Sequence, residues 1–162
     1  MGNYIKDQKP ADDEWMAFSG LENVDNLPAG DIYVPLEEWK VQREELLKRN
    51  SRLGVILSNT DDIAELVKDL DRLDLVVLEF PKMADGRAFT QARLLRDRLG
   101  YKGEIRATGD VLRDQIFYMQ RCGFNSFEIS DGESMDSALK AFNEMTVTYQ
   151  PACDESLPIW RR

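Results

Sequence analysis

A nearly continuous apolar run, Leu75-Val76-Val77-Leu78-Glu79-Phe80, lies near the middle of the chain and is followed by Pro81. Such a run is typical of a strand that is buried on both faces, as in a parallel sheet covered by helices. Proline cannot donate a hydrogen bond to a neighbouring strand, so Pro81 ends the strand. The run therefore favours an α/β fold.

The alternation of an apolar run with a helical pattern occurs four times between residues 53 and 145. Predicted strands begin near residues 53, 73, 104 and 126, and predicted helices cover residues 60–70, 87–99, 111–122 and 133–145. Strand spacings of 20, 31 and 22 residues suit short right-handed crossovers. We therefore expect a (βα)4 parallel sheet, either open or shaped like half of a β/α barrel.

The flanking segments are predicted as follows. Residues 36–49 should form an amphipathic helix that covers the second face of the sheet. Residues 1–30 should form an N-terminal segment, with a small hairpin between Tyr4-Ile5 and residues 15–18 and a linker over residues 23–30. A single α/β domain is then expected over residues 31–148, and a tail over residues 149–162. Unblocked edge strands would also favour a homodimer.

Composition excludes several classes of function. The 162 residues include 30 acids and 21 bases, for a net charge of -9, which argues against binding to nucleic acid or to anionic membranes. The chain has no histidine, which removes His-based acid/base chemistry, haem ligation by His and most catalytic zinc sites. No metal site is expected, and no cofactor is evident, because the sequence has neither a dinucleotide fingerprint nor a Walker loop.

The N-terminus has neither the basic start nor the apolar stretch of a signal peptide, and the chain has no apolar run long enough to cross a bilayer. We therefore expect a soluble cytoplasmic protein. Its two cysteines should then be free thiols. Cys122 is predicted to be buried and structural, and Cys153 to be exposed in the tail.

A candidate site is expected at the carboxyl ends of the strands, where ligands bind in parallel α/β sheets. Residues 82–121 carry nine bases and five acids in an otherwise acidic chain. An oxyanion such as sulfite, sulfate or phosphate could bind here. The candidate anion ligands are Lys82, Arg87, Arg106 and Arg113, and the candidate proton carriers are Glu79 and Asp110.

The same residues admit a structural interpretation. Arg87 could pair locally with Asp85, and Arg93, Arg96 and Arg98 could lie on a solvated helix face. Three charges interrupt the strands themselves, and Arg106 could lie between Glu79 and Glu128 as a buried ion triad. The functional alternative is a general acid/base carboxylate whose pKa is set by that burial and by Arg106.

Several segments together resemble the bacterial domain-of-unknown-function family 934, and the resemblance covers about residues 30–153. They are Val34-Pro35-Leu36 with Trp39, Arg52-Leu53-Gly54-Val55, Leu78-Glu79-Phe80-Pro81-Lys82, Asp85-Gly86-Arg87-Ala88, Gln91-Ala92-Arg93-Leu94-Leu95-Arg96, Glu104 through Gln115, Arg121-Cys122-Gly123-Phe124 and Tyr149-Gln150-Pro151-Ala152. Members of this family carry an oxidoreductase label connected with sulfite reduction.

The resemblance implies an accessory role in assimilatory sulfite or sulfate reduction, with sulfite reductase or its electron donor as the partner. Docking could use an acidic surface made of Asp61, Asp62, Asp69, Asp71 and Asp74, because a negative chain suits a basic partner. The alternative is a small oxyanion-binding enzyme or module that uses the basic site at the carboxyl edge of the strands. Whether the chain is itself an enzyme stays open.

Overall fold

The computed structural model describes residues 3–20, 27–82 and 84–161. Within them, one eight-stranded sheet has the strand order β2-β1-β8-β7-β6-β5-β4-β3. All neighbouring pairs from β3 to β8 are parallel, whereas β1 pairs antiparallel with both β8 and β2. The strands are β1 (Tyr4–Lys6), β2 (Lys9–Pro10), β3 (Met16–Ala17), β4 (Ile32–Pro35), β5 (Leu53–Leu57), β6 (Leu75–Phe80), β7 (Glu104–Gly109) and β8 (Ser126–Glu128).

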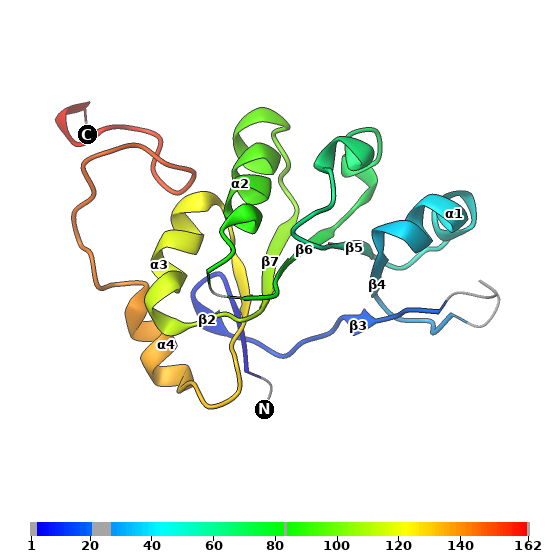
Figure 1. Cartoon of the computed structure of the whole chain (residues 1–162), viewed down its shortest axis with the longest axis horizontal. Coiled ribbons are helices and arrows are strands. Elements are labelled where there is room, and N and C mark those ends of the chain that lie inside the picture. Colours follow the sequence, from blue (N-terminus) through cyan, green and yellow to red (C-terminus); the bar gives the residue numbers. More distant parts are fainter. Residues whose placement is uncertain (1–2, 21–26, 83, 162) are drawn as a thin grey trace.

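The sheet curls into a half-barrel, and the helices cover its outer face (Figure 1). The α-helices in the described residues are α1 (Leu36–Leu46), α2 (Arg87–Arg93), α3 (Arg113–Cys122) and α4 (Met135–Ala141). Helix α2 continues as a π-helix over Leu94–Arg98. The main core forms between these helices and outward-facing strand residues such as Val76, Ile105 and Phe127. None of the helices within the described residues has the length and apolar character needed to cross a bilayer.

The α/β class, the half-barrel shape and the four predicted strands are confirmed, but the sheet is not a simple (βα)4 unit. The helix predicted over residues 60–70 is wrong, because two short 3-10 helices, Ile63–Leu66 and Leu70–Arg72, follow β5. Aspartate side chains compete with helical hydrogen bonds in this segment. Asp62 accepts from the backbone N–H of Ala64 at 2.9 Å, and Asp69 turns inward toward α1.

The N-terminal hairpin exists, but its predicted partner strand is wrong. Strand β1 pairs with β2 through a turn at Asp7 and Gln8, both of which have positive φ. Met16 and Ala17 instead form β3 at the opposite edge of the sheet, beside β4. Strand β4 was not predicted, and residues 23–26 of the linker expected over residues 23–30 lie outside the described residues.

Residues 11–15, which we call the strap, join the two edges of the sheet and cross its concave face (Figure 1). Trp15 packs there on Leu75 and Val77 in a second small core. The prediction that helix α1 covers this face is therefore wrong, since Trp39 and Leu46 of α1 pack in the main core with the other helices. The chain covers its concave face with an irregular segment.

Candidate functional site

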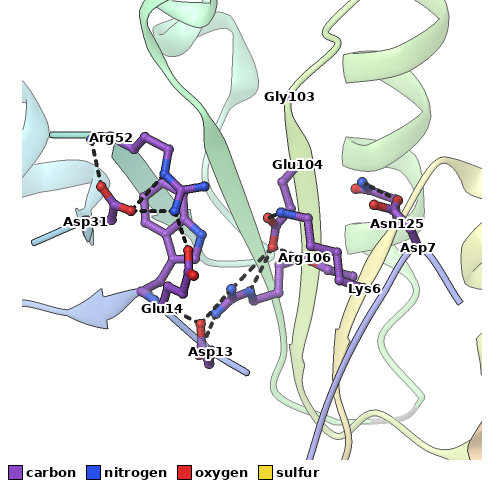
Figure 2. A network of polar contacts seen from close by, with 12 residues as sticks. Lys6, Asp7, Asp13, Glu14, Asp31, Arg52, Gly103, Glu104, Arg106 and Asn125 are labelled. Atoms are coloured by element: carbon purple, nitrogen blue, oxygen red, sulfur yellow. Dashed lines mark hydrogen bonds and ion pairs between the residues drawn. The ribbon is translucent and has the colours of Figure 1, made fainter. Parts of the chain in front are cut away.

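A polar network lies on the concave face, toward the amino-terminal ends of the parallel strands (Figure 2). At its centre is Arg106 of β7, whose side chain is 1% exposed. Its two terminal nitrogens donate to the two carboxylate oxygens of Asp13 in the strap, each at 2.9 Å. Two-point pairing of this kind is a strong arrangement for a guanidinium and a carboxylate. The strap thus places a carboxylate directly on a buried cation.

Aromatic rings enclose the same guanidinium. Its central carbon lies 4.4 Å from the ring centroid of Tyr4 and 5.9 Å from that of Tyr33, within the range of cation–π attraction. Burial alone would lower the pKa of Arg106, but hydrogen bonds to Asp13 and the neighbouring negative charge raise this pKa above its ordinary value. Arg106 therefore stays fully charged inside the protein.

Glu104 supplies the second negative charge of the network. It accepts hydrogen bonds from the Tyr4 hydroxyl at 2.5 Å, from Lys6 Nζ at 2.6 Å and from the Ser126 hydroxyl at 2.8 Å. The nitrogens of Arg106 are farther from it, at 3.3 and 3.4 Å. Burial raises the pKa of Glu104, but the hydrogen bonds, that of Lys6 foremost, bring the pKa below its ordinary value. Glu104 is therefore an ionised carboxylate held mainly by Lys6, Tyr4 and Ser126.

Arg52 extends the network toward the other edge of the sheet. It donates to Asp31 and to Glu14 of the strap, each at 2.7 Å, and its guanidinium lies 5.2 Å from the ring centroid of Trp15. A cavity of about 310 Å³ lies beside the strap and is bordered by two cations and two acids. Its lining residues are Tyr4, Lys6, Ala11, Asp12, Glu14, Trp15 and Arg52.

The candidate anion ligands are not gathered in one site. Lys82 and Arg87 are exposed, and Arg87 pairs with Asp85 at 3.2 Å, as the structural interpretation predicts. Arg113 pairs with Glu144 and donates to the carbonyl of Ser137 at 3.2 Å. Arg106 lies apart from them on the concave face.

The two candidate proton carriers lie near the carboxyl ends of β6 and β7. Glu79 is exposed on β6, and the backbone N–H of Asp110 donates to the carbonyl of Phe80 at 2.8 Å. The next carboxylate along this rim, Glu128, is exposed and accepts a hydrogen bond from the Thr108 hydroxyl at 2.5 Å. At this rim, Arg87 and Glu128 therefore have separate local partners.

The predicted triad of Glu79, Arg106 and Glu128 is wrong, because Arg106 pairs with Glu104 and Asp13 instead. Glu104 lies two residues before Arg106 on the same strand, and side chains two apart share a face. Glu104 could have been identified from this spacing. Asp13 could not, since it comes from an irregular segment 93 positions away.

Arg96 also departs from its predicted place on a solvated helix face. It donates to three backbone carbonyls, those of Gly123 at 2.9 Å, Tyr101 at 2.7 Å and Gly103 at 2.8 Å. A Cβ atom at Gly123 would lie 2.4 Å from Cγ of Arg96, so the absent side chain makes room for this arginine. Arg96 therefore ties α3 to the loop before β7.

Both cysteines are free. Cys122 is buried as predicted, and burial raises the pKa of its thiol. Cys153 is half-buried rather than exposed, and its thiol donates to Asp97 at 3.2 Å. Burial and this hydrogen bond raise the pKa of Cys153 to about 11. Neither thiol therefore has the low pKa of a reactive cysteine.

Fold and site together define an α/β half-barrel protein whose concave face carries a buried arginine covered by an acidic strap. Residues 54–160 match the family described as "Bacterial protein of unknown function (DUF934)", and the chain belongs to this family. This confirms the family predicted from the sequence. No curated protein matches the chain.

Glu104 and Arg106 lie inside the region that matches the family, whereas Tyr4 and Asp13 precede it. Among the residues described here, no group of three acids or cysteines is placed to hold a metal ion.

Proposed function

We propose that this chain is an accessory protein of assimilatory sulfite reduction that docks, in the cytoplasm, on sulfite reductase or on its electron donor. The family resemblance supports the choice of reaction. A concentration of exposed apolar side chains near the C-terminus supports docking. Of the nine large apolar side chains that are exposed among the described residues, five lie between positions 145 and 160. These are Met145, Val147, Tyr149, Leu157 and Trp160.

The tail that carries these side chains is held in place at the end of α3. Arg121 pairs with Asp154 at 2.9 Å and donates to the carbonyl of Gln150 at 2.6 Å. A backbone hydrogen bond of 3.2 Å from Ile159 to the carbonyl of Tyr149 joins the two ends of the tail. This bond brings Tyr149 and Trp160 to the same region, where they are 71% and 73% exposed.

Anchored, exposed aromatic side chains are suited to protein recognition, because tyrosine and tryptophan dominate the energetics of many interfaces. We call Tyr149 and Trp160 the aromatic pair. The tail runs past the outer side of α3, away from the strap (Figure 1). A partner bound to the aromatic pair would therefore leave the concave face free.

Negative charge would add electrostatic steering toward a basic partner. Asp71 and Asp74 are exposed and can contribute to it. Asp69 cannot, because it is 3% exposed and is bound to Trp39 and Arg43, which corrects the acidic surface predicted from the sequence. In this proposal the partner carries the redox chemistry, and the chain contributes binding.

Growth on different sulfur sources tests this function. A strain that lacks the chain should grow on sulfide, which bypasses sulfite reductase, and should grow poorly on sulfate or sulfite. The double variant Tyr149→Ala/Trp160→Ala should behave like the deletion. Val41→Ala is the matched control, because Val41 is 83% exposed on α1, far from the tail in sequence. Equal growth of the deletion strain on all three sources would contradict the proposal.

A further inference from the structure

The strap is acidic, and it lies over the basic side chains of the concave face. It contains Asp12, Asp13 and Glu14 in succession. Asp13 pairs with Arg106, and Glu14 pairs with Arg52. These contacts come from a segment without regular secondary structure.

The charge pattern makes Asp13 the group that neutralises Arg106. Lys6 and Glu104 form one close pair at 2.6 Å, and Glu104 also receives short hydrogen bonds from Tyr4 and Ser126. Arg106 reaches Glu104 only at 3.3 Å or more, but it reaches Asp13 twice at 2.9 Å. Without the Asp13 carboxylate, a nearly inaccessible guanidinium would lack its best acceptor, which is costly in a protein interior.

The exposed fractions of the two side chains show from which side another anion could replace the Asp13 carboxylate. The Arg106 side chain is 1% exposed, whereas that of Asp13 is 37% exposed. Asp13 therefore separates the guanidinium from solvent, and the cavity beside the strap is lined by the neighbouring Asp12 and by Tyr4 and Lys6. An incoming anion would have to displace one side chain of an irregular segment, with the sheet left in place.

We infer that the concave face is a binding site for a small oxyanion, which takes the place of the Asp13 carboxylate on Arg106. The ligand is a carboxylate, phosphate, sulfate or sulfite group that can accept two parallel N–H donors. In the unliganded chain, Asp13 occupies the site as an internal competitor. This inference does not depend on docking by the tail, and it places the anion site at the end of the strands opposite to the predicted basic edge.

Removal of the competitor gives the decisive experiment. Asp13→Ala should lower the melting temperature, and phosphate, sulfite or acetate should restore it in a saturable way at constant ionic strength. Asp71→Ala makes the same change of charge at an exposed residue outside the strap and its cavity, and it leaves Arg106 covered. It should respond to the anions no more than the wild-type chain does. Comparison of acetate with phosphate and sulfite separates a carboxylate ligand from a tetrahedral or pyramidal one.

Binding to the folded protein gives a second measurement. In Asp13→Asn, which keeps the shape of the side chain, the affinity for phosphate should be at least about tenfold higher than in the wild type. The shifts in nuclear magnetic resonance spectra should centre on the Nε–H of Arg106 and the indole N–H of Trp15. If the anions stabilise Asp13→Ala, Asp71→Ala and the wild type equally, and Asp13→Asn shows no saturable shift at Arg106, then the ion pair is structural only and the inference is wrong.

Discussion

The indole nitrogen of Trp39 donates a hydrogen bond of 3.1 Å to the carboxylate of Asp69, inside the core between α1 and the 3-10 segment that follows β5. Arg43 donates to the same carboxylate at 2.8 and 2.9 Å through Nε. The side chain of Asp69 therefore connects α1 to the 3-10 segment.

Asp69→Ala should destabilise the fold by about 2 kcal/mol, because the buried indole N–H loses its acceptor. Arg43 is partly exposed and can return to water, so it adds little to this loss. Urea unfolding of Asp69→Ala and of Asp71→Ala, an exposed neighbour, checks the value. A loss below about 0.5 kcal/mol in Asp69→Ala would show that the indole finds another acceptor.

Acid should weaken the concave network through Glu104. The pKa of this carboxylate in the folded chain is lower than its ordinary value, which is about 4.3 in an unfolded chain. Its stabilising contribution is therefore complete above the unfolded pKa and is lost as the pH falls through the folded pKa. The free energy of unfolding should fall less steeply below about pH 4 in Glu104→Gln than in the wild type. The exposed Glu44→Gln serves as control, and identical slopes in all three proteins would contradict the assignment.

Two glycines with positive φ differ in what surrounds them. A Cβ atom at Gly109 would lie 2.4 Å from the carbonyl oxygen of Phe80, whereas a Cβ at Gly100 would meet nothing within 4 Å. Gly100→Ala should cost about 1 kcal/mol, from backbone conformation alone. Gly109→Ala should cost at least about twice as much, because the end of β7 must move away from β6. Thermal unfolding of the two variants makes the comparison, and equal losses would contradict the close approach at Gly109.

Cys153 should react slowly with thiol reagents at neutral pH, because a pKa of about 11 leaves little thiolate. Asp97→Asn removes a charge that favours the protonated thiol, so it should lower this pKa and accelerate alkylation at pH 8 by about tenfold for each unit of change. Cys122→Ser in the same background isolates the signal of Cys153. Faster reaction of the wild type than of Asp97→Asn would contradict the predicted effect of Asp97.

The central part of the fold could be predicted from the sequence because its signals are local. The apolar run over residues 75–80 and the helical pattern over residues 111–122 depend on neighbouring residues, and the structure places β6 at Leu75–Phe80 and the end of α3 at Cys122, as these patterns predict. The edges could not be predicted in the same way. Strands β2 and β3 have two residues each, too few for a periodic pattern, and they lie at opposite edges of the sheet although only five residues separate them in sequence.

The site was predicted in part. An arginine within an apolar strand requires a carboxylate partner, and Arg106 has two. The sequence contains several acids that could pair with Arg106. The alternation of side chains along a strand favours Glu104, but it has no bearing on Asp13. The run Asp12-Asp13-Glu14 before Trp15 was the remaining signal, since an aromatic residue that packs on the sheet also carries its acidic neighbours there.

Binding between the purified full-length chain and purified sulfite reductase, measured by titration calorimetry at low ionic strength, tests the proposed function most directly, with the electron donor titrated in parallel. We expect a saturable complex with one of the two proteins, weakened by salt. Tyr149→Ala/Trp160→Ala should reduce its affinity by at least about tenfold, and Val41→Ala should leave it unchanged. The absence of a complex with either protein, an affinity that the double variant leaves unchanged, or self-association of this chain through the aromatic pair would contradict the account.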